Sequence, residues 1–391
     1  MRASLLLRAL SRDHRVDVWC LPVAGAQPRQ PRGQDGDGSA RLSTAALEVD
    51  PGWVLARRAG AEALRRLGRP SICRFITHRA VADLRRDFGP LEGYRCTVVY
   101  RSYLLPFVIS AAQGPEDLGL RVLDLDDDEA MTRRRLAELE PASSAEHLLE
   151  AELFERFEAE HLPWAHQLLA AQEPHAERLR QQMPSLDVDV LPNAVTIPES
   201  PPADRPLEEQ QADTLRLVFV GTLSYLPNHA AARELALEIL PLLRQGGRPV
   251  SLRLIGRSPP PDIAELAGLE GVELVTDCLD LEPHYAWAHL TVIPLRAGGG
   301  TRIKILEAFA AGVPVVATAM AADGLRVEDG EQLLLAESAQ DLASEALRLH
   351  RSPELASGLA LSARRWVAKH HDRERVAGGL ADRIRELSPR R

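Results

Sequence analysis

The sequence is poor in cysteine, aromatic residues and lysine, and it has no excess of positive charge. Its four cysteines are scattered over 391 residues without a Cys-x-x-Cys pair, which excludes a disulfide framework and a zinc knuckle. Aromatic residues make up 4% of the chain and the net charge is −9, so we exclude a nucleic-acid binder, which needs a basic surface and stacking platforms. The uncharged run 308–322 is too short to span a bilayer. We therefore expect a cytoplasmic protein, with a peripheral contact to the inner membrane left open.

The composition is that of an ordinary globular protein, except that nearly all of its basic residues are arginine. Hydrophobic residues make up 45% and charged residues 26%, and the length suggests two or three domains. Of the 47 basic residues, all but Lys304 and Lys369 are arginine. A lysine in a chain that otherwise uses arginine is a candidate for a specific functional role.

Short apolar runs alternate with helical patterns in both halves of the chain. Because these runs are continuous rather than alternating, they predict strands buried on both faces, as in a parallel sheet. The runs occupy 16–21, 97–100, 120–125, 168–171, 215–220, 251–255, 272–275, 290–294 and 313–317. Helices are predicted over 2–10, 144–161, 228–243 and 373–387, and a loop over 24–41.

A stretch with five prolines, 192–214, separates two periodic regions and reads as a linker. We expect a doubly wound α/β domain over 1–190, joined by the tail 373–391, a linker over 191–214, and a second such domain over 215–372. Two domains of this kind would face each other across a cleft, with ligand loops at the carboxyl ends of their strands.

The densest chemical signal follows the predicted strand 290–294. A glycine-rich turn leads into a helix, so backbone N–H groups and the helix N-terminus could meet an anion. Its members are Gly298, Gly299, Gly300, Thr301, Arg302, Lys304 and Glu307. Thr301 could cap the helix or donate to a phosphate, the two cations could meet a diphosphate, and Glu307 could accept hydrogen bonds from ribose. We expect neither Lys304 nor Glu307 in the core. The alternative is an ordinary strand-to-helix turn with a solvated basic end.

The residues that follow resemble a known family. Positions 306–317 read Leu-Glu-Ala-Phe-Ala-Ala-Gly-Val-Pro-Val-Val-Ala, which is similar to the carboxy-terminal signature of the family 4 retaining glycosyltransferases (glycosyl transferase group 1). Further landmarks occur in the family's order, namely Leu-Pro-Asn-Ala at 191–194, Phe-Val-Gly-Thr at 219–222 and Leu-Ile-Gly at 254–256. Tyr-Leu-Pro-Asn at 225–228 and the turn at 298–304 resemble a branch that acts in polysaccharide assembly.

The resemblance implies the GT-B fold, which has two Rossmann-like domains. It also implies transfer of a sugar from a nucleotide-sugar to a glycan, lipid-linked or small-molecule acceptor, with retention of configuration and without a cofactor. The donor-binding residues that it implies are Gly221, Thr222, Arg257, Gly298, Gly299, Gly300, Thr301, Arg302, Lys304 and Glu307.

The sequence departs from the family at three places. Gly299 stands where the family often has its first glutamate, and Thr222 begins an uncharged stretch, up to His229, where the family often has a basic pair. The first strand and glycine-rich loop of the amino-terminal domain are expected to be missing. These departures leave open a catalytically impaired nucleotide-sugar-binding or scaffold homologue. A nucleotide-sugar epimerase of the same two-domain fold has no motif in its favour.

In the first domain, an acidic segment at 124–129 follows a predicted strand. We expect its Asp126 and Asp127 to lie on the acceptor side, and we expect no metal site, since the family binds its diphosphate with backbone amides and cationic side chains.

The family uses a histidine near 99–103, where this chain has none, so Arg101 becomes a catalytic candidate beside Lys304. The arginine run 133–135 is interpreted as a solvated helix face, with contact to anionic lipid or acceptor as the alternative.

Overall fold

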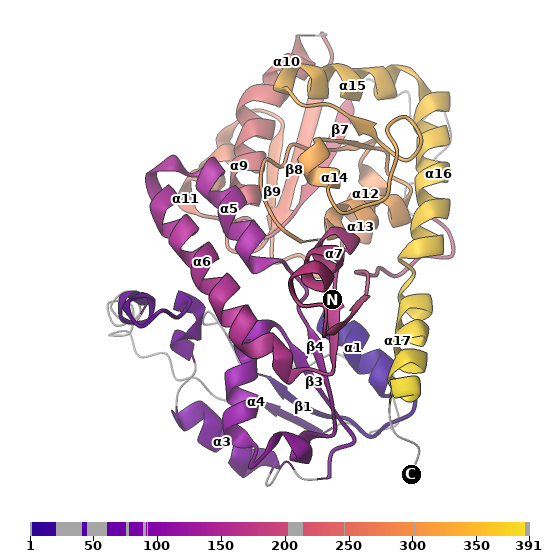
Figure 1. Ribbon diagram of the computed structural model, residues 1–391. Helices are drawn as coiled ribbons and strands as arrows, with labels where there is room; N and C mark the ends of the chain where they lie inside the picture. Colours follow the sequence, from indigo (N-terminus) through magenta and orange to yellow (C-terminus); the bar gives the residue numbers. More distant parts are fainter. Residues whose placement is uncertain are drawn as a thin grey trace. The chain divides into compact units, whose positions relative to one another are not determined.

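The computed structural model describes residues 2–20, 41–44, 61–75, 78–88, 91, 93–201, 214–245, 247–300 and 302–387. These residues form two compact units (Figure 1). Unit 1 comprises 1–137, 142–192 and 374–391, and unit 2 comprises 138–141 and 193–373. The loop predicted over 24–41 lies outside the described residues except for Arg41, and so do positions 202–213 of the predicted linker.

Unit 1 is built on a parallel sheet of order β3-β4-β5-β6, with a separate parallel pair β1-β2. Its strands are β1 (Asp17–Cys20), β2 (Arg41–Thr44), β3 (Cys96–Tyr100), β4 (Leu120–Asp124), β5 (Gln167–Ala170) and β6 (Asp187–Val190). Its helices are α1 (Arg2–Leu10), α3 (His78–Phe88), α4 (Leu105–Ala111), α5 (Glu129–Leu139), α6 (Ser144–His161), α7 (Glu173–Gln182) and α17 (Arg373–Leu387). All four residues of β5 are buried, as expected of a central parallel strand.

Unit 2 contains two three-stranded parallel sheets, β7-β8-β9 and β10-β11-β12. A parallel bridge from Leu217 to Leu290 joins β7 to β10. The strands are β7 (Leu215–Val220), β8 (Val250–Gly256), β9 (Val272–Thr276), β10 (Thr291–Ile293), β11 (Val315–Ala317) and β12 (Leu334–Leu335). The helices are α9 (Leu226–Glu234), α10 (Leu240–Arg244), α11 (Pro261–Glu265), α12 (Glu282–Trp287), α13 (Ile303–Ala311), α14 (Ala319–Ala322), α15 (Ala339–Arg351) and α16 (Pro353–His370).

Alternation of strand and helix along the chain produces this layered arrangement in each unit. In unit 2 a single hydrophobic core runs from β7 through α13 to α16, and Phe219 and Phe309 are among its fully buried side chains. The helix predicted over 228–243 is interrupted by a π-helical turn, Leu235–Ile239, between α9 and α10. The long helix predicted over 144–161 is α6, and the tail helix predicted over 373–387 is α17.

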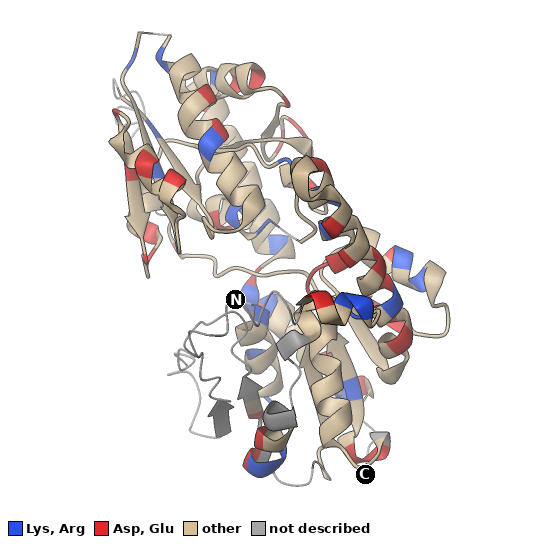
Figure 2. Cartoon of the chain, turned by 90° about the vertical axis from the view of Figure 1, so that its left-hand side faces the viewer, with Lys and Arg blue, Asp and Glu red and all other residues tan. Residues whose placement is uncertain are grey.

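Charged residues of both signs lie along the described helices (Figure 2). Several form ion pairs within one helix, such as Arg86 with Asp83 and Arg385 with Asp382. Among the described helices, none combines the length and the apolar character that crossing a membrane requires.

Candidate nucleotide-binding site and acidic cluster

The candidate site in unit 2 lies where its parallel strands end. Gly221 follows β7, Arg257 follows β8, and the glycine-rich turn follows β10. Because these strands are parallel, their carboxyl ends share one edge of the array, so the three segments lie at the same edge.

Arg302 shapes the glycine-rich turn from the inside. Its side chain is buried, and its guanidinium donates to the carbonyl oxygen of Gly298 at 2.8 Å and to that of Met320 at 3.5 Å. Gly298 has φ +126°, and a Cβ there would lie 2.4 Å from the Arg302 guanidinium, so this position requires glycine. The guanidinium predicted to meet a diphosphate is thus bound to carbonyl groups of its own turn and of α14.

Lys304 lies in the first turn of α13 and points back toward β7. Its ammonium nitrogen is 4.2 Å from the centroid of the Phe219 ring and donates to Asn228 Oδ1 at 2.5 Å. Burial, with a smaller contribution from the Arg302 charge, lowers the Lys304 pKa to about 7, although Glu307 opposes this shift. Lys304 was expected outside the core, but it is half-buried, because its side chain reaches the Phe219 ring of β7 and the Asn228 side chain of α9.

Gly221 leaves the space that this arrangement needs. A Cβ at this position would come within 2.8 Å of the Asn228 amide nitrogen and 3.1 Å of the Lys304 ammonium. At Gly256, at the end of the neighbouring strand, a Cβ would meet the Gly221 carbonyl oxygen at 1.9 Å. The two strand ends therefore approach more closely than any side chain would permit.

Glu307 lies one turn further along α13, beside a buried tyrosine. The Tyr285 hydroxyl donates to Glu307 Oε2 at 3.4 Å. Burial raises the Glu307 pKa to about 7, against the Tyr285 hydrogen bond and the Lys304 charge, which both lower it. Glu307 is half-buried as well, contrary to the expectation that it lies outside the core.

The other predicted donor-binding residues differ in their surroundings. Thr222 and Arg257 are exposed, and their carbonyl oxygens accept backbone hydrogen bonds from Tyr225 and Leu223. Gly299 and Gly300 lie half-exposed in the turn, while Thr301 lies outside the described residues.

Three residues that the sequence interpretation did not assign to the site take part in it. They are Phe219, Asn228 and Tyr285. Asn228 belongs to the Tyr-Leu-Pro-Asn landmark, so the motif drew attention to this residue. It did not indicate that Asn228 contacts Lys304, which lies 76 residues further along the chain.

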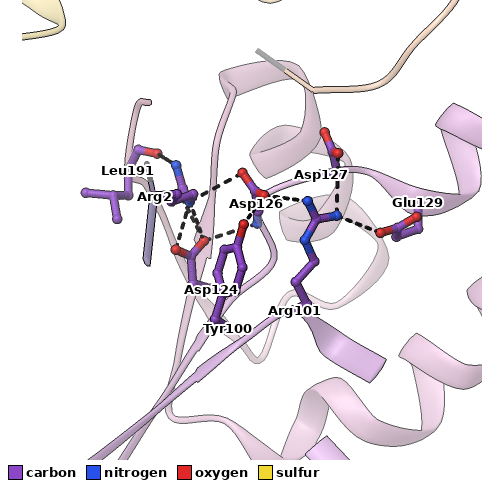
Figure 3. Close-up of polar contacts among 8 residues, drawn as sticks. All are labelled: Arg2, Tyr100, Arg101, Asp124, Asp126, Asp127, Glu129 and Leu191. Carbon is purple, nitrogen blue, oxygen red and sulfur yellow. Dashed lines mark hydrogen bonds and ion pairs between the residues drawn. The ribbon is translucent and has the colours of Figure 1, made fainter. Parts of the chain in front are cut away.

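An acidic cluster in unit 1 gathers at the carboxyl ends of β3 and β4 (Figure 3). Arg2, at the start of α1, donates from Nε to both carboxylate oxygens of Asp124 at 2.8 and 2.7 Å, and from a terminal nitrogen to the Leu191 carbonyl at 2.7 Å. Arg2 is 3% exposed and Asp124 is fully buried. This buried ion pair attaches the first residue of α1 to the carboxyl end of β4.

Arg101, a catalytic candidate, is surrounded by carboxylates in the same cluster. Its guanidinium lies 2.7 Å from Asp126, 2.8 Å from Glu129 and 3.5 Å from Asp127 (Figure 3). Burial acts to lower the Arg101 pKa, but these carboxylates outweigh it and raise the pKa. The Tyr100 hydroxyl also donates to Asp126, at 2.6 Å.

The backbone of this cluster is in an uncommon conformation. Arg101 has φ +77° and Asp126 has φ +60°, both in the left-handed region. The predicted acceptor-side residues Asp126 and Asp127 are therefore held together with Arg101. Within the described parts of the chain, no group of three or more His, Cys, Asp and Glu residues could hold a metal ion.

Residues 214–352 match the model of the family described as "Glycosyl transferases group 1". No curated protein sequence matches the chain.

Solved structures resemble the chain over nearly its whole length. Sucrose-phosphate synthase from Thermosynechococcus elongatus superposes with a TM-score of 0.69 at 17% identity, covering 98% of this chain and 92% of that one. A UDP-forming α,α-trehalose-phosphate synthase from Burkholderia vietnamiensis gives a TM-score of 0.67 at 13% identity, with coverages of 99% and 98%. HepE from Anabaena, solved with UDP and glucose, gives 0.59 at 16% identity, with coverages of 98% and 96%. These likenesses show the GT-B fold.

Proposed function

We propose that this protein transfers a sugar from a nucleotide-sugar, because residues 214–352 match the model of the group 1 glycosyl transferases in a chain with the GT-B fold. The observation that carries the proposal is the cation at the carboxyl edge of unit 2. Lys304 is held there beside Gly221, at the start of a helix within the matched segment. Its contact with Asn228 leaves its charge unneutralised.

The reaction places its largest charge on the departing nucleoside diphosphate. An ammonium group fixed before the reaction stabilises that charge without reorganising, and this is where catalysis of the step gains most. We assign this role to Lys304, helped by the backbone amides of the turn 298–300. Glu307 is assigned to the ribose hydroxyls, for which a carboxylate oxygen is a good acceptor.

On the acceptor side we assign Asp126 and Asp127, with Arg101 holding their carboxylates in place. The acceptor is proposed to be a glycan, a lipid-linked sugar or a small molecule of polysaccharide assembly, and the transfer to proceed with retention. For a lipid-linked acceptor, the arginine run 133–135 would supply the contact to an anionic membrane surface.

We further propose that transfer needs no divalent metal. Lys304 and backbone amides supply the positive potential that a metal would otherwise bring to the diphosphate. Transfer should persist when EDTA is added. Complete loss in EDTA that Mn²⁺ restores would contradict this part of the proposal.

The test uses the two lysines of the chain as a matched pair. Wild-type protein, Lys304→Ala and Lys369→Ala are assayed for donor hydrolysis and transfer with a panel of nucleotide-sugars, and nucleoside diphosphate binding is measured by calorimetry. A charge-assisted contact contributes about 1.5–3 kcal/mol, so Lys304→Ala should weaken binding roughly ten- to a hundred-fold. Lys369 is exposed on α16, and its variant should behave as wild type.

Two outcomes would decide against the proposal as stated. Equal binding by wild type and Lys304→Ala would remove Lys304 from the site. Wild-type protein that binds a nucleotide-sugar but neither transfers nor hydrolyses it would favour the catalytically impaired homologue.

A further inference from the structure

Asn228 makes contacts at both ends of its side chain. It lies in the first turn of α9 and is 9% exposed. Its amide nitrogen donates to the Thr222 carbonyl at 3.0 Å, and its amide oxygen accepts from the Lys304 ammonium at 2.5 Å. The reverse amide orientation would set an N–H₂ group against an ammonium and an oxygen against a carbonyl, so the two partners fix the orientation.

No carboxylate is in direct contact with the Lys304 ammonium in the described part of the chain. On its own helix the charged neighbours are Glu307, one turn away, and Arg302, whose guanidinium is turned to carbonyl groups. From β7 it meets the face of Phe219, and on α12 the Tyr285 hydroxyl donates to Glu307. The hydrogen-bond acceptor that the Lys304 ammonium meets is the neutral amide of Asn228.

The remaining titratable group on the first turn of α9 is already paired. His229 directs its Nε2 to Asp262, at the start of α11, at a distance of 2.7 Å. Asn228 is thus the polar group of α9 that faces Lys304, and it is a neutral one.

We infer that Asn228 is the positioning residue for Lys304, holding the ammonium toward the diphosphate of the donor with a neutral acceptor that does not compete with phosphate. A carboxylate in this place would hold the lysine equally well, but it would neutralise the charge that the diphosphate needs. The inference rests on the proposed function, since it assumes that a nucleoside diphosphate binds beside Lys304. The lowered pKa of Lys304 supports it, because an ammonium with a neutral partner gains most from an arriving anion.

Asn228→Asp is the most informative variant, because it keeps the size of the side chain and the contact with Lys304. It is compared with Asn228→Ala, which removes the contact, and with wild type. Since the chain has two lysines, protein labelled with ¹³C at lysine Cε gives two lysine signals, and Lys369→Arg identifies the signal of Lys304. The pH at which that signal titrates reports the partner of Lys304 in each variant.

Binding is measured on the same proteins with inorganic pyrophosphate, UDP, GDP and the corresponding nucleosides. We expect Asn228→Asp to raise the pH of the Lys304 titration by a unit or more, and to weaken pyrophosphate and nucleoside diphosphate binding roughly ten-fold or more, because its carboxylate competes for the ammonium. Nucleoside binding should change less than three-fold. In Asn228→Ala the titration should move to lower pH, since the buried ammonium loses its acceptor.

The two failures are distinguishable. If wild type binds UDP or GDP and Asn228→Asp binds it equally well, the inference is overturned while the proposed function stands. If wild type binds none of the nucleotides nor pyrophosphate, the proposed function fails and the inference with it. An unshifted Lys304 titration in Asn228→Asp would show that the two side chains do not meet, and it would overturn the positioning role.

Discussion

The ion pair between Arg2 and Asp124 should be a major determinant of the stability of unit 1. Both side chains are buried, and the Asp124 carboxylate receives two hydrogen bonds from Arg2 and one from the Asp126 backbone N–H at 3.1 Å. Asp124→Asn keeps the shape but leaves the buried Arg2 guanidinium with only the more distant Asp126 carboxylate, at 3.7 Å. Breaking a buried pair in this way costs about 3–5 kcal/mol.

For a unit of this size each kcal/mol corresponds to a few degrees, so the midpoint of thermal unfolding should fall by roughly 6–20 °C. Urea unfolding followed by tryptophan fluorescence, together with calorimetry, measures the change. The matched control is Asp382→Asn, which breaks an exposed pair with Arg385 on α17 and should cost under about 1 kcal/mol.

The double variant Arg2→Leu/Asp124→Leu separates charge from packing. Because it leaves no unpaired charge, it should recover much of the stability that Asp124→Asn loses. Stability of Asp124→Asn within about 1 kcal/mol of wild type would refute the reasoning, since a loss of 3–5 kcal/mol is expected for a pair this deeply buried.

Three further changes have defined outcomes. Burial raises the pKa of Glu158 to about 7, above its ordinary 4.5, so the folded state binds the extra proton and stability should fall as pH rises from about 4.5 to 7. The free energy of unfolding, measured by urea titration at pH 5 and at pH 8, should therefore differ less in Glu158→Gln than in wild type. The control Glu152→Gln, at an exposed position, should show the same difference as wild type. Gly221→Ala should weaken nucleoside diphosphate binding at least ten-fold, because its Cβ would displace Asn228 and Lys304; calorimetry giving wild-type affinity would disprove the close approach. Glu307→Gln should weaken UDP and uridine alike and leave pyrophosphate binding unchanged, and a loss confined to pyrophosphate would exclude a ribose contact.

Local signals predicted the fold well. Continuous apolar runs predicted nine of the twelve described strands within a residue or two, since a strand buried on both faces has little freedom in composition. They gave no sign of β2, β6 or β12. β10 and β11 are shorter than their runs, because an apolar segment does not reveal where ladder hydrogen bonds begin and end.

The site was less predictable because its contacts join distant parts of the chain. The sequence pointed to Lys304 and Glu307 as chemically active, but not to their burial, which depends on contacts with Phe219 of β7 and Tyr285 of α12. Arg302 was expected to bind an anion, and its bonds to carbonyl groups depend on how the turn folds back. No spacing rule connects Arg2 with Asp124, 122 residues away.

The return of α17 to unit 1 bears on how the chain could be divided. This helix buries Val376 and Leu380, and Arg383 pairs with Asp189 of β6 at 2.7 Å. A fragment ending at residue 192 would expose the apolar face that α17 covers, so it should not fold as an autonomous domain. One protease cut between the units would not release either of them, because the polypeptide passes between them more than once. A cleaner division is a circular permutation that links the present termini and opens the chain near 192. Segment 374–391 would then precede residues 1–192, and unit 1 would be interrupted only by 138–141.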